Sequence, residues 1–240
     1  KLEPEKMVKL MNEYLTEMTD VLIRHQGTLD KYIGDAIVAF YGAPAPVKDQ
    51  EKKACSTSLE MHERLDYLRT KWKNEGEWPD IVYNMQHRIG LNSGQMVTGN
   101  MGSEMRMNYT MMGDTVNLAA RLEPAAKQYG VYILVGENIY EATNDEYAFR
   151  FLDFLSVKGK TIPIKAYELI QTKESINKKS IELVDLFEKG LDNYFNQKWD
   201  DAIKLFEKSI VLEDNFKGRN TNPSQVFIER CDYLKNNPPE

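Results

Sequence analysis

A glycine-aspartate turn between two β-rich runs constrains the fold of this chain more than any other short segment. The first run covers residues 28–33, and the second begins at Ala36, directly after Gly34 and Asp35. Glycine and aspartate are favoured in two-residue hairpin turns, which need a positive φ angle. The sequence therefore predicts a β-hairpin whose tip presents the carboxylate of Asp35.

A second motif, YTMMGDTVNLAAR at residues 109–121, leads from a strand into a helix. Asp114 suits the N-cap position of that helix. Asn117 and Arg121 are four residues apart, so we expect them to share one face of it. A side-chain amide and a guanidinium on one face can bind phosphate oxygens together. The two motifs thus supply groups that suit a nucleoside triphosphate.

The rest of the chain alternates helical and strand patterns. Apolar residues at helical spacing predict a helix over residues 4–25. A charged helix is predicted over residues 49–73, after Pro44 and Pro46 break the chain, and a short helix near 137–143. Strands are predicted at residues 81–91, 96–97, 106–111, 131–135, 147–157 and 161–169, with residues 96–97 as the short antiparallel return of the strand at 81–91. Strands that alternate with helices and hairpins indicate an α+β fold, in which helices pack on a largely antiparallel sheet.

The composition changes after Ile170. Residues 171–179 are polar and predict a linker, whereas residues 180–240 predict a small helical segment. The run WDDAIKLFEKSI at residues 199–210 resembles a tetratricopeptide helical hairpin. A single unit of that kind cannot bury its own apolar face. We therefore expect it to cap a short array or to pack on the preceding domain.

Composition and charge exclude several classes of protein. The formal net charge is −6, and nucleic-acid binding normally needs a basic excess, so no nucleic-acid partner is expected. The only two cysteines, Cys55 and Cys231, are too few for a disulfide framework, which indicates a reducing compartment. No apolar run reaches the length of a membrane span. We expect a cytoplasmic chain without membrane contact, whether alone or within a larger, membrane-tethered or multidomain protein.

These motifs resemble the catalytic domain of the class III nucleotidyl cyclases, and the adenylyl branch more than the guanylyl branch. The resemblance covers residues 1–170 and includes the segments 87–103, 109–123 and 157–169. It implies a ferredoxin-like α+β sandwich that acts as a homodimer, with each active site shared between two protomers. The implied reaction converts ATP to 3′,5′-cyclic AMP and pyrophosphate.

The resemblance also implies which residues carry out the reaction. Asp35 matches one of two metal-binding aspartates, which together hold two divalent ions, Mg²⁺ or Mn²⁺. Asn117 matches the amide that orients the ribose, and Arg121 matches the arginine that meets charge on the α-phosphate. These roles are assigned from the position of each residue within its motif.

Substrate binding is expected from a further group of positions. Lys31 can only donate hydrogen bonds, so it suits the N1 acceptor of adenine and not the N1–H of guanine. Thr110 can accept a hydrogen bond from the adenine amino group, and this lysine/threonine pair resembles the subgroup that includes bicarbonate-responsive cyclases. Arg88 matches a polyphosphate-binding arginine, to which either Lys160 or Lys158 adds.

Two other functions compete with an active adenylyl cyclase. The second metal-binding aspartate of the family lies in a Phe-x-Asp-Ile strand that this sequence does not contain; we expect that strand upstream of Lys1, because a sheet without it would expose an unpaired edge. A catalytically silent cyclase-homology module that binds a nucleotide or a partner is the alternative. A diguanylate cyclase is disfavoured, because residues 33–36 read IGDA where that class has a Gly-Gly-Asp/Glu-Glu-Phe turn.

Overall fold

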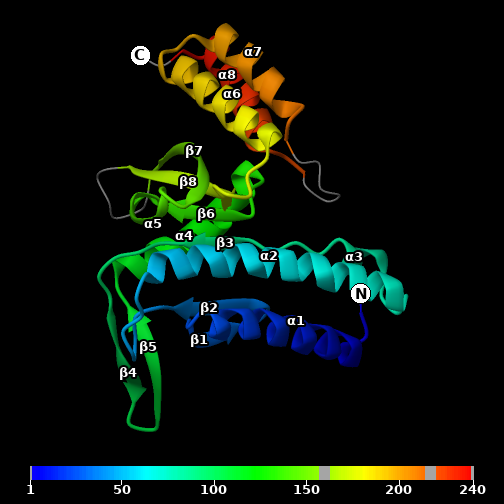
Figure 1. The fold of residues 1–240 in the computed structure, drawn as a ribbon, viewed down its shortest axis with the longest axis vertical. Helices are drawn as coiled ribbons and strands as arrows, with labels where there is room; N and C mark the ends of the chain where they lie inside the picture. The colour runs from blue at the N-terminus through cyan, green and yellow to red at the C-terminus, as the bar shows by residue number, and fades with distance from the viewer. Residues whose placement is uncertain (1, 157–162, 214–219, 239–240) are drawn as a thin grey trace. The chain divides into compact units, whose positions relative to one another are not determined.

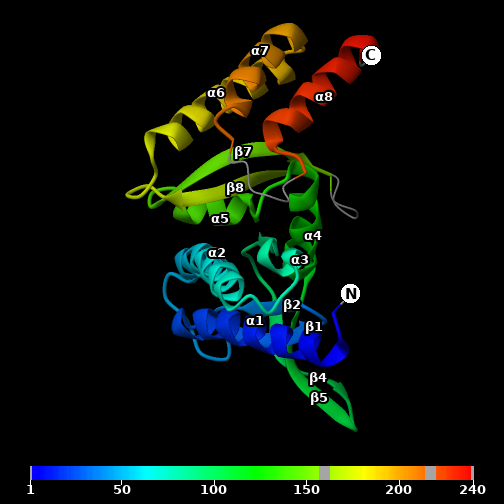
Figure 2. The ribbon, with the colours of Figure 1, turned by 90° about the vertical axis from the view of Figure 1, so that its right-hand side faces the viewer.

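The computed structural model describes residues 2–156, 163–213 and 220–238 of the chain (Figures 1 and 2). These residues divide into two compact units. Unit 1 contains the chain up to residue 87 together with residues 93–118, and unit 2 contains residues 88–92 together with the chain from residue 119 onward. In both units helices pack with strands that are mainly antiparallel, which confirms the predicted α+β fold class.

Unit 1 is built around two long helices that lie side by side (Figure 1). Helix α1 extends over Pro4–Arg24 and α2 over Gln50–Glu75, close to the predicted ranges. Both helices carry apolar residues at intervals of three or four positions, so each presents an apolar stripe to the core. The buried core of the unit consists of Leu10, Tyr14, Met18, Leu65, Leu68, Trp72, Trp78 and Val82.

The segment after α2 differs from its predicted structure. The sequence pattern predicts a strand over residues 81–91, but the chain forms the short helix α3 at Asp80–Tyr83 and strand β3 at Ile89–Leu91 only. Val82 of α3 is buried in the core of unit 1. A short apolar run does not by itself distinguish a strand from a buried helical turn, so packing on the core decides the conformation.

Two antiparallel hairpins complete unit 1. In the first, β1 (Thr28–Ile33) pairs with β2 (Ala36–Phe40), as predicted. In the second, β4 (Val97–Ser103) pairs with β5 (Arg106–Met112). The prediction that residues 96–97 pair with the strand before them is therefore wrong. Val97 instead begins a longer strand whose partner follows it in the chain.

Unit 2 contains a mixed sheet of order β3-β6-β8-β7. Strand β6 spans Ile133–Gly136, β7 spans Tyr147–Leu155 and β8 spans Ile164–Thr172, near their predicted positions. β3 pairs with β6 in parallel, whereas the β6/β8 and β7/β8 pairs are antiparallel. Every residue of β6 is buried, which accounts for its continuous apolar run.

Helix α4, Asp114–Tyr129, approaches the sheet of unit 2 closely at Gly90 of β3. A Cβ atom added at Gly90 would lie 2.5 Å from the carbonyl oxygen of Ala119 and 2.6 Å from the backbone nitrogen of Glu123. Only glycine allows this approach, which sets the distance between α4 and β3. The short helix α5, Glu137–Thr143, follows β6 as predicted.

The C-terminal helical segment consists of α6 (Lys178–Phe195), α7 (Trp199–Ile210) and α8 (Pro223–Asn236), which lie on the β7 and β8 side of unit 2 (Figure 2). Its core contains one buried aromatic residue from each helix, Phe187, Phe206 and Phe227, whose ring centroids are 5.3, 5.6 and 5.5 Å apart. The segment therefore buries its apolar faces within the unit. None of the described helices has the length and apolar character needed to cross a membrane.

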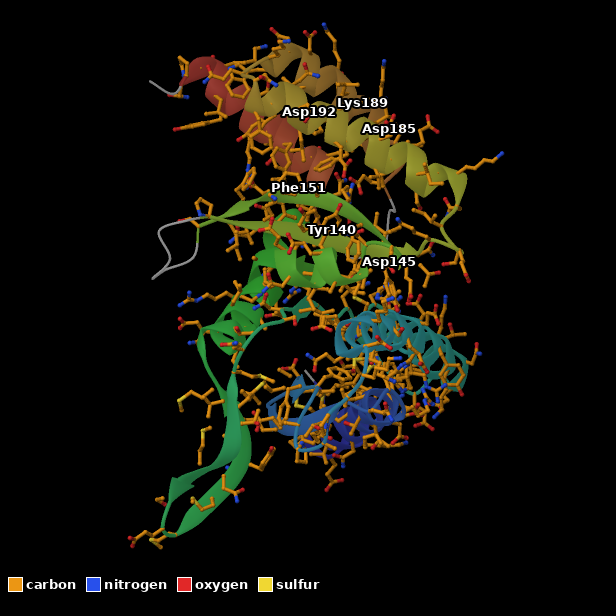
Figure 3. All side chains as sticks on the ribbon, turned by 60° about the vertical axis from the view of Figure 1, so that its left-hand side comes forward. Tyr140, Asp145, Phe151, Asp185, Lys189 and Asp192 are labelled. Carbon is orange, nitrogen blue, oxygen red and sulfur yellow. The ribbon has the colours of Figure 1, made fainter. Side chains whose placement is uncertain are left out.

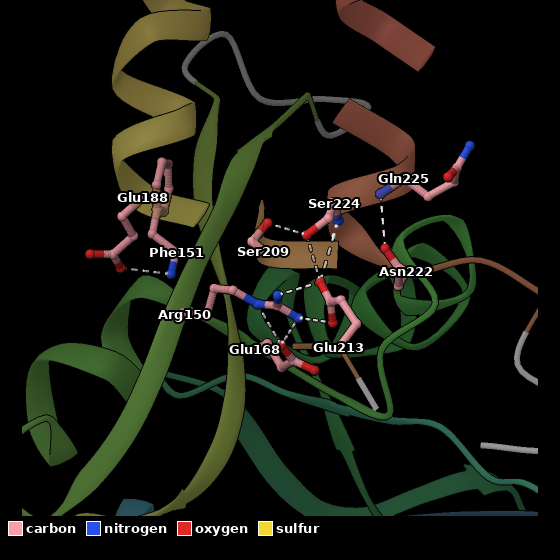
Figure 4. Close-up of polar contacts among 9 residues, drawn as sticks. All are labelled: Arg150, Phe151, Glu168, Glu188, Ser209, Glu213, Asn222, Ser224 and Gln225. Carbon is pink, nitrogen blue, oxygen red and sulfur yellow. Dashed lines mark hydrogen bonds and ion pairs between the residues drawn. The ribbon is translucent and has the colours of Figure 1, made fainter. Parts of the chain in front are cut away.

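A buried arginine joins this helical segment to the sheet (Figure 4). Arg150 of β7 is 1% exposed, and its guanidinium lies 2.6 Å from a carboxylate oxygen of Glu168 on β8 and 2.7 Å from one of Glu213, which follows α7. Glu213 also accepts a hydrogen bond from the Ser224 hydroxyl of α8 at 2.9 Å. Burial lowers the pKa of Arg150, but the two carboxylates outweigh burial, and the pKa is raised. The charged arginine thus links α7 and α8 to the sheet.

We expect Arg150→Met to lower the free energy of unfolding by about 3–5 kcal/mol, because two buried carboxylates then face each other without a counter-charge. Chemical denaturation would measure the loss. Asp185→Asn is the matched control, since Asp185 pairs with Lys189 at 2.6 Å on the exposed surface of α6 (Figure 3), where ion pairs contribute little. Similar losses in both variants would contradict a stabilising role for the buried network.

Candidate functional site

Lys31 and Thr110, the two residues predicted to read the base, lie together in unit 1. Lys31 is on β1 and Thr110 on β5, and the Lys31 ammonium donates a hydrogen bond to the Thr110 hydroxyl oxygen at 3.4 Å. The Thr110 hydroxyl in turn donates to the Asp30 carboxylate at 2.9 Å. The same carboxylate oxygen lies 3.4 Å from the Lys31 ammonium. The pair predicted to read the base is therefore part of a cluster of three side chains, and the sequence analysis did not identify Asp30.

A β-bulge explains how two consecutive residues reach Thr110. Neighbours on a strand normally point to opposite faces of the sheet. Here Leu29 pairs with Ala39 and Lys31 pairs with Val38, so Asp30 is an extra residue without a partner in the ladder. Bulges re-aim side chains and are common beside active sites. Because strand alternation does not reveal a bulge, no local sequence signal points to Asp30.

Asp35 lies at the tip of the β1–β2 hairpin, as predicted. Gly34 precedes it with a φ of +62°, a left-handed conformation that glycine adopts without strain. The Asp35 side chain is exposed, and no hydrogen bond or ion pair engages it among the described residues. Its charge still acts on Tyr14 of α1. The pKa of Tyr14 is raised to about 12, first by burial and then by the Asp35 carboxylate. Asp35 is therefore an available carboxylate beside the core of unit 1.

Asn117 and Arg121 both lie on the exposed side of α4, one helical turn apart. The helix begins at Asp114 itself, so the prediction of Asp114 as the N-cap is wrong by one residue. Gly113 precedes the helix with a φ of +150°, and its carbonyl accepts the Asn117 N–H at 3.1 Å. Leu118 and Leu122 are buried, which turns the intervening positions toward solvent.

The residues expected to bind the polyphosphate lie in different parts of the chain. Arg88 is exposed directly before β3, and its Nε donates a hydrogen bond to the Glu123 carboxylate of α4 at 2.9 Å. Sequence reasoning did not identify Glu123, which holds Arg88 near α4 within unit 2. Lys158 and Lys160 lie outside the described residues.

A metal centre would draw on Asp35 in this chain. Within the ranges that the structure describes, no group of three or more potential metal-ligating side chains occurs. Mg²⁺ at a phosphate-transfer site is usually held by one or two carboxylates together with substrate phosphates and waters, rather than by a cage of side chains. The exposed, unpaired carboxylate of Asp35 fits one ligand of such a set.

The comparisons with known proteins agree on a single family. Residues 1–171 match the adenylate and guanylate cyclase catalytic domain. Adenylate cyclase 1 of Rhizobium meliloti (strain 1021) is 30% identical over 174 residues, and the match covers 72% of this chain. This chain spans only 25% of that relative's length.

Two similar solved structures are cyclases that are named for different nucleotides. The adenylyl cyclase CyaB from P. aeruginosa is 30% identical with a TM-score of 0.65, covering 74% of this chain and 88% of that one. The guanylyl cyclase Cya2 is 31% identical with a TM-score of 0.61, covering 73% of this chain and 86% of that one. Because overall similarity does not separate ATP from GTP, the choice of nucleotide has to be argued from individual residues.

Proposed function

Because this chain belongs to the adenylate and guanylate cyclase catalytic-domain family, we propose that it converts ATP to 3′,5′-cyclic AMP and pyrophosphate. The cluster of Lys31, Thr110 and Asp30 carries the choice of ATP. The Lys31 side chain is 48% exposed and its ammonium can donate to N1 of adenine, while the Thr110 oxygen can accept from the 6-amino group. Guanine presents the opposite pattern at both positions, with an N1–H and an O6 acceptor. The direct test is chromatographic detection of cyclic AMP formed from ATP.

The reaction is an intramolecular phosphoryl transfer. The ribose 3′-hydroxyl gives up its proton to solvent and its oxygen forms a bond to the α-phosphorus. The bond from the α-phosphorus to the bridging oxygen breaks, and pyrophosphate leaves with that electron pair. Asn117 would orient the ribose, and Arg121 would stabilise the charge that develops on the α-phosphate. Arg88, with Lys158 or Lys160, would hold the polyphosphate.

Asp35 would contribute a carboxylate ligand to one or both of two divalent ions, Mg²⁺ or Mn²⁺. When bound, such ions lower the pKa of the attacking hydroxyl and neutralise phosphate charge. Asp35 can serve this role because its carboxylate is exposed at a hairpin tip and is not engaged by another described side chain.

A homodimer would complete the site. The β4–β5 hairpin exposes several apolar side chains, among them Met105 at 97% and Val97, Met107 and Met112. Exposed apolar clusters of this kind favour a protein partner, and methionine adapts well to such contacts. In the proposed arrangement, Asp35 and Arg88 of one protomer face Lys31, Thr110, Asn117 and Arg121 of the other, so Lys31 and Asp35 of one chain serve different sites.

A catalytically silent module that binds a nucleotide or a partner remains the alternative function. ATP binding without cyclic AMP formation in the full-length protein would support it. The division into a catalytic domain over 1–170, a linker over 171–179 and a tetratricopeptide-like segment over 180–240 is likewise a proposal.

We expect Lys31→Glu combined with Thr110→Cys to shift the preference from ATP toward GTP. The glutamate supplies an acceptor for guanine N1–H, and the second change removes the hydroxyl that pairs with the adenine amino group. Lys31→Glu also deprives Asp30 of its ammonium partner, so total activity should fall. The measurement is therefore the ratio of kcat/KM for ATP to that for GTP, with excess Mn²⁺. An unchanged ratio would show that these residues do not read the base.

A further inference from the structure

We propose that Asp30 is a positioning residue for base selection, which holds the Thr110 hydroxyl as a fixed hydrogen-bond acceptor toward the purine. This inference rests on the proposed function, because it concerns how the same site would choose ATP over GTP. Asp30 acts through Thr110 and is not itself expected to touch the substrate.

The hydrogen bonds of Thr110 determine what its hydroxyl can still offer. A hydroxyl has one hydrogen to donate and two lone pairs that accept. An ionised carboxylate can only accept, so the 2.9 Å contact with Asp30 commits the single hydrogen of Thr110 to that bond. Lys31 can only donate, so its 3.4 Å contact uses one lone pair. One lone pair remains, and toward a purine the hydroxyl is an acceptor only.

The two purines respond differently to a fixed acceptor. Adenine carries a 6-amino group that can donate to the free lone pair of Thr110. Guanine carries O6 at the same place, so two acceptors would face each other without a hydrogen between them. A threonine without Asp30 could rotate its hydroxyl and donate to O6. The discrimination therefore depends on the carboxylate as well as on the threonine.

The burial of the Asp30 side chain indicates a role beyond the structure of the bulge. Its side chain is 3% exposed, and its second carboxylate oxygen, Oδ1, is buried without a hydrogen-bond partner among the described residues. An incompletely bonded buried carboxylate disfavours folding, and stability alone would be better served by a neutral residue. Local features that oppose stability are expected where function requires them. The bulge that turns Asp30 toward Thr110 is a second feature of this kind.

The test is Asp30→Ala, assayed in the full-length protein with ATP, GTP and purine riboside triphosphate, which keeps N1 of adenine but lacks the 6-amino group. We expect the ratio of kcat/KM for ATP to that for GTP to fall roughly tenfold, because one hydrogen-bond mismatch in the site is relieved. The ratio for ATP to purine riboside triphosphate should fall as well. Asp30→Asn, which keeps the shape but holds the hydroxyl more weakly, should shift both ratios less and in the same direction.

Two comparisons test whether Asp30 acts on base selection through Thr110. If Asp30 acted mainly by steadying Lys31, ATP and purine riboside triphosphate would lose activity equally, because both present N1. In a Thr110→Ala background, Asp30→Ala should cause no further change in the ATP to GTP ratio. Asp20→Ala, which removes an exposed carboxylate of α1, is the charge-matched control and should leave every ratio unchanged.

Competition binding with 3′-deoxy-ATP and 3′-deoxy-GTP, which cannot cyclise, separates this inference from the proposed function. Absence of cyclic AMP formation by the wild type would contradict the proposed function, but the binding ratio would still test Asp30. Three results would each overturn the inference. The first is an unchanged ratio in folded Asp30→Ala, and the second is an equal loss of activity with ATP and with purine riboside triphosphate. The third is a further change in the ATP to GTP ratio when Asp30→Ala is added to Thr110→Ala.

Discussion

Arg121→Ala and Asn117→Ala are each expected to lower kcat by about 10²–10³-fold while changing the affinity for ATP only a few-fold. Both side chains would contact groups whose charge or geometry changes in the transition state, and the loss of one such contact typically costs about 2.7–4 kcal/mol of transition-state stabilisation. Steady-state kinetics with ATP would give kcat, and competition with 3′-deoxy-ATP would give affinity independently of turnover.

The exposed positions of Asn117 and Arg121 separate an effect on catalysis from an effect on folding. Asn117 and Arg121 are exposed on α4, so neither substitution should disturb the buried side of the helix. Lys127→Ala is the matched control, because Lys127 is an exposed cation in the last turn of the same helix. It should leave kcat unchanged. Full turnover in Arg121→Ala or Asn117→Ala would exclude that residue from the mechanism.

Complementation between two inactive variants is the second large effect that we expect. Asp35→Ala and Asn117→Ala should each be nearly inactive alone but regain activity when mixed. In a mixed dimer one site carries both substitutions and the other carries neither. Random exchange of subunits makes about half of the dimers mixed, so at most about a quarter of the wild-type sites are restored.

Subunit exchange has to be measured separately, for example by pull-down of one tagged variant with the other. Mixing Asn117→Ala with Arg121→Ala is the control. In the proposed arrangement one protomer supplies both Asn117 and Arg121 to a given site, so every site in the mixture lacks one of these two residues. Recovery in this control, or no recovery between Asp35→Ala and Asn117→Ala despite confirmed exchange, would contradict sites shared between protomers.

The elements that the sequence predicted well depend on interactions between near neighbours. The Gly34-Asp35 turn follows from the conformational freedom of glycine, and the first helix follows from apolar residues at helical spacing. The shared face of Asn117 and Arg121 follows from the helical repeat alone. Their catalytic roles stay predictions, because they come from the resemblance of the motif to a family.

The wrong strand predictions concern segments whose structure depends on distant partners. Residues 81–91 are apolar enough for a strand, but packing of Val82 in the core of unit 1 produces the helix α3. Strand β3 pairs in parallel with β6, more than forty residues later, instead of with the segment that follows it. Pairing of that kind is decided by the whole sheet and not by the local pattern.

The sequence by itself determined the fold class, the hairpin that presents Asp35, and the placement of Asn117 and Arg121 on one exposed helical face, because each depends on local conformational preference and periodicity. Only the tertiary structure brought Asp30 to Thr110, Glu123 to Arg88 and Glu213 to Arg150. These contacts join residues that are far apart in the chain. A hydrogen bond or ion pair between such residues exists only once the backbone has placed both partners within about 3 Å of each other, so no property of either residue alone reveals it.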